Sequence, residues 1–303
     1  MKSIKLLTFL FAISLSTSSF ARTIKIYGEA HRTSKCIEQR TLLAAKATQG
    51  TTLLFGENLY FNQTQKAMKE NRESLGLVSF QNVYGLEDFN LKYYILSITY
   101  LNKILDSYGN QLVLHKDYKI LHKVDKDYLF AITALKTVTN LPVELKKYLD
   151  YEEFLTYECK SLGKCNEYVF SNIISKAKIL IRELYNLVSQ VAPANIPSLS
   201  EISNEYESYQ LFLDEYPQYR HSYSKRNIEI LVLWRNHLMI DRLAQKLNEP
   251  AHENTDEISI ILGAAHVHHF IFLMKTKYYE QFVKNGDELY LDLSCWNGHF
   301  TNI

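Results

Sequence analysis

Four short apolar runs end at or beside a glycine, and an acidic residue or a histidine follows each glycine within three positions. They read IKIY before Gly28-Glu29-Ala30-His31, TTLLF before Gly56-Glu57, NVY before Gly85-Leu86-Glu87, and SIIL before Gly263-Ala264-Ala265-His266. Helical patterns separate the runs. Strands that alternate with helices indicate a parallel sheet covered by helices.

The predicted elements divide the chain into two kinds of structure. The predicted strands are Thr23 to Tyr27, Thr51 to Phe55, Val78 to Tyr84, Ile258 to Leu262 and Glu288 to Leu293. The predicted helices are Lys35 to Thr48, Gln63 to Leu75, Asn90 to Leu105, Lys225 to Leu247 and Val267 to Lys284. The middle of the chain is rich in Tyr, Leu and Lys and mostly helical in pattern. We therefore predict an α/β fold with a mainly parallel sheet flanked by helices: a core of residues 22–107 and 221–303, and a helical insertion or cap of residues 108–220.

The first 21 residues have the pattern of a cleavable secretory signal peptide. Lys2 and Lys5 precede an apolar run from Leu6 to Leu15, and Ser19-Phe20-Ala21 offers small residues at the two positions that a signal peptidase reads. The run is shorter than the roughly 20 residues that a membrane span needs. We expect cleavage between Ala21 and Arg22, a secreted or periplasmic mature chain, and no stable membrane insertion.

The charge balance bears on the kind of partner. The chain has 34 basic and 33 acidic residues, and loss of Lys2 and Lys5 with the leader leaves 32 against 33. Nucleic-acid binding requires a clear basic excess. We therefore expect a small-molecule or peptide substrate and no nucleic acid.

Four cysteines, an even number, suggest disulfides in a secreted chain. Cys159 and Cys165 are close enough in sequence to close a small loop, and Cys36 with Cys295 is the other pairing. Free buried thiols are the alternative.

The residues at the strand ends predict a site. The carboxyl ends of parallel strands meet at one edge of a sheet and form its ligand crevice, so we expect Glu29, His31, Glu57, Glu87 and His266 to converge there. Histidines and carboxylates together hold divalent metals such as Mn²⁺, Zn²⁺ or Co²⁺, and the predicted ligands are Glu29, His31, Glu57 and His266. The same residues also suit metal-free catalysis, with a histidine as general base.

Two further histidines follow His266, and each acid of the predicted site also has a simpler explanation. His266 and His269, three apart, could share a helical face, whereas His268 and His269 are expected around the site or at the surface rather than as ligands. Any one acid could instead be a helix-terminal residue stabilised by the helix dipole; the repetition at four strand ends favours a site. The sequence has no Gly-x-Ser-x-Gly elbow, no His-Glu-x-x-His and no phosphate-binding glycine loop.

Several of these motifs together resemble the erythromycin esterase/ChaN-like superfamily, which includes the TraB/Tiki proteins. The resemblance covers roughly residues 23–105 and 225–293. It rests on Tyr27-Gly28-Glu29-Ala30-His31, a helix with Glu38 and Arg40, Leu54-Phe55-Gly56-Glu57, Val83-Tyr84-Gly85-Leu86-Glu87, Trp234-Arg235-Asn236-His237-Leu238-Met239 and Ile261-Leu262-Gly263-Ala264-Ala265-His266.

The resemblance implies a hydrolase that acts on an ester, lactone or peptide bond, and we expect it to depend on a divalent metal. His31 would be general base or metal ligand, His266 would complete the site, and Arg40 or Arg235 could stabilise an oxyanion. The esterases work without metal and the Tiki proteins with one. Arg32 after His31 departs from the esterase pattern and argues against a macrolide substrate.

Two other functions stay open at this point. ChaN-like proteins bind haem, so a haem- or metal-binding protein without turnover is the main alternative. An interaction module with a vestigial site is the third.

Overall fold

The computed structural model describes residues 22–29, 47–60, 82–108, 118–150, 167–191, 193, 195–215, 217, 224–252, 255–282, 288–292 and 300–302. The predicted signal peptide, the four cysteines, His31 and Arg40 lie outside these residues. The expectations that rest on them remain predictions.

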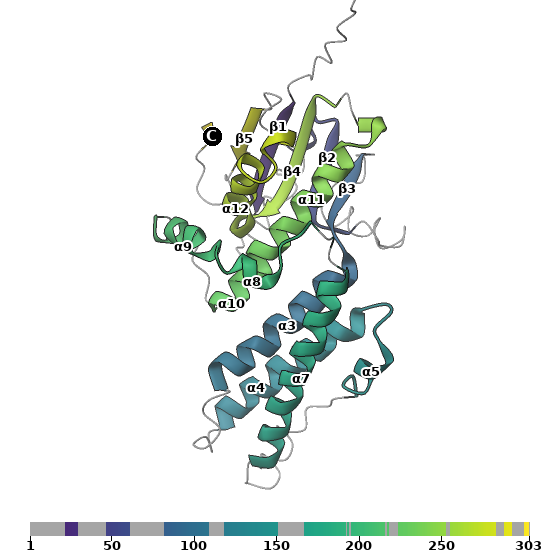
Figure 1. Ribbon diagram of the computed structural model, residues 1–303, viewed down its shortest axis with the longest axis vertical. Helices are drawn as coiled ribbons and strands as arrows, with labels where there is room; N and C mark the ends of the chain where they lie inside the picture. Colours follow the sequence, from purple (N-terminus) through teal and green to yellow (C-terminus); the bar gives the residue numbers. More distant parts are fainter. Residues whose placement is uncertain are drawn as a thin grey trace, which may run out of the picture.

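A six-stranded sheet, mostly parallel, forms one end of the molecule (Figure 1). Its strands, in the spatial order β3-β2-β4-β1-β5-β6, are β1 Thr23–Glu29, β2 Leu53–Tyr60, β3 Val83–Glu87, β4 Glu257–Gly263, β5 Glu288–Asp292 and β6 Phe300–Asn302. The first five are parallel, and β6 pairs antiparallel with β5. The predicted α/β fold with a mainly parallel sheet is confirmed.

The strand register aligns the motifs found in the sequence. Gly56 pairs with Ile261 on one side and with Gly85 on the other, and Glu29 pairs with Gly263. The carboxyl ends of β1, β2, β3 and β4 therefore meet at one edge of the sheet.

The elements outside the sheet are helices. They are α3 Phe89–Tyr108, α4 Tyr118–Thr137, α5 Val143–Lys146, α7 Glu167–Val191, α8 Leu199–Ile202, α9 Tyr206–Glu215, α10 Lys225–Ile228, the π-helix η2 Glu229–Trp234, α11 Arg235–Leu247, the 3₁₀ helix η3 Pro250–His252, α12 Ala264–Lys275 and α13 Tyr279–Phe282. Helices α3, α4 and α7 pack together beyond the carboxyl edge of the sheet (Figure 1). Because α3 belongs to this bundle, the helical part already begins at Phe89, whereas the prediction placed its start at residue 108.

The described residues form two apolar cores, and one continuous helical rod contributes to both. The core of the bundle takes Ile228 and Leu233 from the rod, and the core beneath the sheet takes Ile240 and Leu243. The rod runs from Lys225 through the π-helix to Leu247. Its polar segment Arg235-Asn236-His237 is buried between the two cores.

Gly263, at the end of β4, has a φ of −59°, and Gly50 is the positive-φ glycine among the described residues. Glu29, Glu57 and Glu87 lie within strands rather than after them, because β1, β2 and β3 each extend beyond the predicted end.

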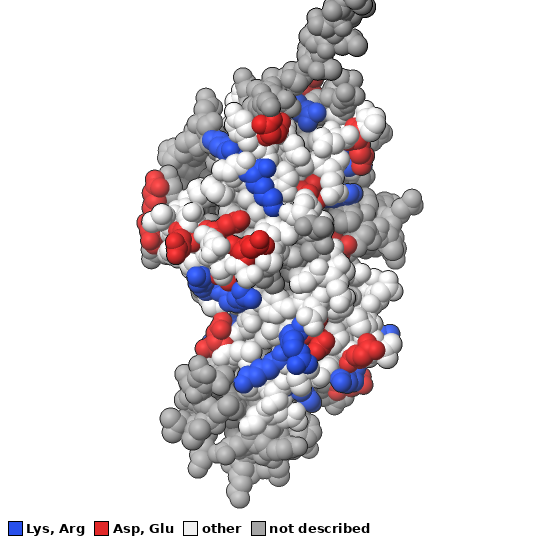
Figure 2. Space-filling view, viewed as in Figure 1, with Lys and Arg blue, Asp and Glu red and all other residues white. Residues whose placement is uncertain are grey.

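Acidic and basic side chains are interspersed over the face shown in Figure 2, with acidic residues gathered over α8 and α9. No helix among the described residues is long and apolar enough to cross a membrane.

Candidate functional site

Arg235 begins α11 at the point where the rod passes the carboxyl edge of the sheet. It directly follows the π-helix, whose six residues are all buried. A π turn inserts an extra residue into a helix and is frequent at functional sites. The Arg235 side chain is 9% exposed and points toward β2 and β3.

Two buried glutamates from neighbouring strands bind the guanidinium of Arg235. Arg235 Nη2 donates to Glu57 Oε1 at 2.8 Å, and Nε donates to Glu87 Oε1 at 2.9 Å, with a further bond from Nη2 to Glu87. The backbone N–H of Gly263 donates to the second oxygen of Glu57, and Lys92 Nζ lies 3.2 Å from the second oxygen of Glu87. These two carboxylates and two cations balance in charge, which buried charges require.

The carboxylates also keep Arg235 charged. Burial by itself lowers the pKa of this guanidinium, but the negative charges and hydrogen bonds of Glu87 and Glu57 outweigh burial and raise the pKa above its ordinary value. Arg235 is therefore a fixed positive charge in a site with little water.

His266, in the first turn of α12, lies against this group and has a defined tautomer. Asn236 Nδ2 donates to the backbone carbonyl of His266 at 3.0 Å, which fixes the orientation of the Asn236 amide. Asn236 Oδ1 therefore faces His266 Nδ1 at 2.7 Å, and because Oδ1 only accepts, Nδ1 carries the hydrogen. The other nitrogen, Nε2, lies 3.4 Å from Arg235 Nη1 and 3.4 Å from Glu57 Oε1, and in the neutral ring it carries the lone pair.

A second cluster continues from Asn236. Its Nδ2 also lies 3.2 Å from His269 Nδ1, and His269 Nε2 lies 2.9 Å from Glu205 Oε2. His237 Nε2 reaches the same carboxylate oxygen at 2.8 Å, and Lys277 Nζ is 3.5 Å from His237 Nδ1.

The pKa shifts in this cluster agree with that hydrogen-bond pattern. For Glu205, burial raises the pKa, but hydrogen bonds and charge interactions with His237 and His269 outweigh burial and lower it to about 2. For His269, burial lowers the pKa and exceeds the opposing effect of Glu205. These shifts favour an anionic Glu205 that accepts a hydrogen bond from a neutral His269.

Glu205, His237 and His269 are also the described residues that could hold a metal ion. One donor atom of each lies within 4.8 Å of the others, and two histidines with one glutamate form a known zinc ligand set. In this arrangement His269 and His237 carry their hydrogens on Nε2, because Asn236 donates to Nδ1 of His269 and Lys277 donates to Nδ1 of His237. An ion could bind here only after both hydrogens move to Nδ1.

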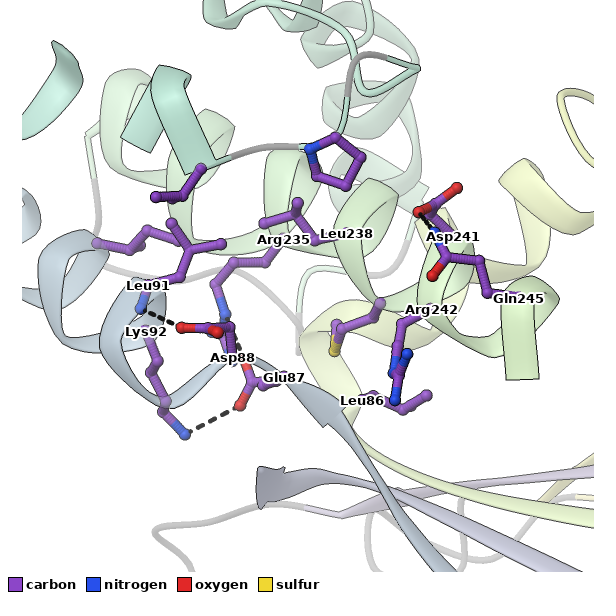
Figure 3. A pocket seen from close by; sticks show the side chains of 14 residues that line it. Leu86, Glu87, Asp88, Leu91, Lys92, Arg235, Leu238, Asp241, Arg242 and Gln245 are labelled. Atoms are coloured by element: carbon purple, nitrogen blue, oxygen red, sulfur yellow. Dashed lines mark hydrogen bonds and ion pairs between the residues drawn. The ribbon is translucent and has the colours of Figure 1, made fainter. Parts of the chain in front are cut away.

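A pocket of about 220 Å³ opens beside the first cluster, between β3, α3 and α11 (Figure 3). Arg235 and Glu87 lie on its wall together with Lys92 and Asp88, and the other lining residues are mainly apolar. Figure 3 shows Glu87, Asp88 and Lys92 close to the Arg235 side chain, with Leu91 and Leu238 on either side. A ligand in this pocket would meet the charged cluster through Arg235 and Glu87.

The structure brings together part of the site predicted from the sequence. Glu57, Glu87, Arg235 and His266 form one buried cluster, whereas Glu29 is placed only as the last residue of β1. Because the Arg235 guanidinium binds Glu57, it opposes a cation in the predicted metal set of Glu29, His31, Glu57 and His266.

Sequence reasoning missed several contributors. His269 lies around the site, one of the two places expected for it, but the prediction did not include its hydrogen bond to Glu205. His268 is exposed, the other expected place, and stacks on Phe212. Asn236 and His237 stood in the quoted helix motif without a role. No motif marks Glu205, whose part depends on contacts with residues 32 and 64 positions away.

Comparisons of this chain with protein families, curated proteins and solved structures find no match.

Proposed function

We propose that the protein is a hydrolase that cleaves an ester or peptide bond at the carboxyl edge of its sheet, outside the cytoplasm. One observation carries the proposal: Glu57, Glu87 and His266, from three separate elements, converge on the buried guanidinium of Arg235 beside a pocket. The strand-end motifs and the resemblance to the erythromycin esterase/ChaN-like superfamily support it.

Each residue of the cluster has a role that its contacts suggest. His266 Nε2, with its lone pair, is a general base that takes a proton from the attacking water. Glu57, 3.4 Å away, stabilises the imidazolium that forms. His31, predicted from the sequence as general base, is the other candidate for this role.

Arg235 would stabilise the oxyanion of the tetrahedral intermediate. Its Nη1 faces the lone pair of His266 Nε2 in the resting state. The other Nη1–H donates to the Leu231 carbonyl at 3.1 Å, so the guanidinium is held in place. Once Nε2 takes a proton, it no longer accepts from Nη1, and this N–H is left for an oxyanion that forms beside it. Preorganised donors of this kind contribute strongly to catalysis in sites with little water.

The arrangement favours a metal-free reaction, because Arg235 supplies the positive charge that a metal would supply. The metal-dependent form, with Mn²⁺, Zn²⁺ or Co²⁺, remains the second version of the proposal. Its support is the Glu205, His237 and His269 group.

The test is a hydrolysis screen of the mature chain on chromogenic esters, lactones and peptides, with and without each of the three metals. We expect turnover of one substrate class, lost in both Glu57→Gln and Glu87→Gln. No turnover, together with a Soret band on haem titration, would support the ChaN-like binding function. Turnover that survives both substitutions would place the reaction elsewhere.

A further inference from the structure

We infer that Glu205 is a positioning residue for His266 and acts on it through His269 and Asn236. This inference rests on the proposed function, because it assigns His266 the part of a base. It gives the helical middle of the chain a role in the site, since Glu205 lies in the turn between α8 and α9.

The direction of every hydrogen bond along this path follows from the chemistry of its atoms. The backbone carbonyl of His266 only accepts, so Asn236 Nδ2 must face it. The same Nδ2 then donates to His269 Nδ1, so the neutral His269 ring carries its hydrogen on Nε2. That Nε2–H donates to Glu205 Oε2 at 2.9 Å.

His237 holds Glu205 from the other side. Its Nε2 lies 2.8 and 3.0 Å from the two oxygens of Glu205, and its Nδ1 faces the Lys277 ammonium, which can only donate. Both imidazoles therefore donate to one carboxylate. Lys277 Nζ in turn donates to the backbone carbonyl of Asn195 at 3.0 Å, which holds the ammonium at this position.

The path ends at His266, whose Nε2 atom is the proposed general base. An anionic Glu205 keeps the His269 hydrogen on Nε2, and so leaves Nδ1 as a second acceptor for the Asn236 amide, beside the backbone carbonyl of His266. The amide in turn presents Oδ1 to His266 Nδ1–H. In the neutral ring, the hydrogen on Nδ1 leaves the lone pair on Nε2, which faces Glu57 and Arg235, as a general base requires.

The imidazole and amide groups around this path are well shielded from water. The side chains of His237 and His269 are 1% and 4% exposed, and Asn236 is fully buried. Hydrogen bonds in such surroundings are stronger and polarise one another along the chain. A change at Glu205 can therefore reach His266 without contact between them.

Tautomers can be measured directly by long-range ¹H–¹⁵N correlation on the full chain with ¹⁵N-labelled histidine, at neutral pH and without added metal. We expect His266 with its hydrogen on Nδ1, and His237 and His269 with theirs on Nε2. Loss of signals in His266→Gln, His237→Gln and His269→Gln assigns the rings. A His266 hydrogen on Nε2 in the wild type would overturn the inference, whatever the activity of the protein.

The decisive variant is Glu205→Gln, with Glu207→Gln as the matched control. Both oxygens of Glu205 accept from imidazole N–H groups, and glutamine replaces one of them by an N–H₂ group and removes the negative charge. With this weaker acceptor, we expect the His269 and His266 signals to shift toward the other tautomer. On a substrate found in the screen, kcat should fall about tenfold with KM unchanged, a part of the roughly 10²–10⁴-fold that a general base contributes. Glu207 is exposed on the first turn of α9, and its substitution should change neither quantity.

The outcomes separate this inference from the proposed function. The expected tautomers and their shift in Glu205→Gln, in a protein that hydrolyses nothing, would support the hydrogen-bond path and refute the hydrolase. Unchanged His266 signals and unchanged kcat in Glu205→Gln would refute the path alone. A rise in KM with kcat unchanged would also contradict it, because it would indicate a substrate contact rather than positioning.

Discussion

Arg235 is the residue on which the site depends, because it neutralises two glutamates that could not otherwise be buried as anions. The Glu57 and Glu87 side chains are 5% and 4% exposed. An unpaired charge at such a position is strongly destabilising, whereas a complete buried pair is close to neutral in free energy.

Replacement of Arg235 by methionine should therefore lower the free energy of unfolding by about 3–5 kcal/mol. Urea denaturation measures it, with Arg182→Met as control: Arg182 also pairs with a glutamate but is exposed, and its loss should change stability by less than about 0.5 kcal/mol. Glu57→Gln and Glu87→Gln added to Arg235→Met should restore part of the loss. Equal stability of Arg235→Met and the wild type would contradict the charge balance described above.

Glu205 predicts a pH dependence of stability. Its pKa in the folded chain is about 2, below the ordinary 4.5, so the unfolded chain takes up the proton first as pH falls. The stabilisation is complete above pH 4.5 and is lost between 4.5 and about 2. Because the side chain is 25% exposed, solvent screening reduces it to about 1–2 kcal/mol.

The measurement is urea unfolding of wild type and Glu205→Gln between about pH 6 and about pH 3. The difference in stability should be constant at the upper end and shrink toward the lower end. A difference that is independent of pH would show that the charge of Glu205 does not stabilise the fold.

Single residues were predictable from the sequence where a local pattern marks them. Glu57, Glu87 and His266 follow apolar runs and glycines, so their convergence could be expected from the edge rule for parallel sheets. Glu205 and His269 could not be assigned in this way, because their contact joins a turn of the helical middle to α12.

At the scale of elements, the strongly patterned ones were predicted best. The bounds of the rod from Lys225 to Leu247 and of strand β4 agree with expectation to within a residue. The π-helix inside the rod was not predicted, since Glu229 to Trp234 is an unbroken, mainly apolar run with no glycine or proline to mark it. All six of its residues are buried, the five apolar ones within the core of the bundle, and this accounts for that composition.

Helix α3 offers an element-scale prediction at its N-terminus. Asp88 precedes Phe89, and its Oδ1 accepts the backbone N–H of Leu91 at 2.8 Å, the contact of a helix N-cap. Asp88→Ala should lower the free energy of unfolding by about 1 kcal/mol, and Asp88→Asn, which keeps the acceptor, should lower it much less. Thermal denaturation of the two variants measures these changes. Equal losses of stability in both variants would show that the hydrogen bond of the cap does not contribute.

At the scale of the whole molecule, the rod joins the two cores and so couples their unfolding. The bundle core contains Leu180 and the core beneath the sheet contains Leu243, both fully buried. If the rod separates from one core, apolar side chains that pack against it in the other core become exposed as well. The sequence indicated a helical part and a sheet part, but not that one helix would serve both.

Leu180→Ala and Leu243→Ala should each lower the stability of one common transition by about 2–5 kcal/mol. Urea unfolding followed by both circular dichroism and tryptophan fluorescence gives the test. Two separate transitions, with each substitution affecting only one, would contradict the coupling.

The most direct test of the central claim is kcat/KM of His266→Ala and His268→Ala on the best substrate from the hydrolysis screen. The two histidines lie on the same helix two residues apart; His266 is buried against Arg235, and His268 is exposed. The account predicts a loss of about 10²–10⁴-fold for His266→Ala and no change for His268→Ala. Equal activity of both variants and the wild type would contradict the assignment of this cluster as the catalytic site.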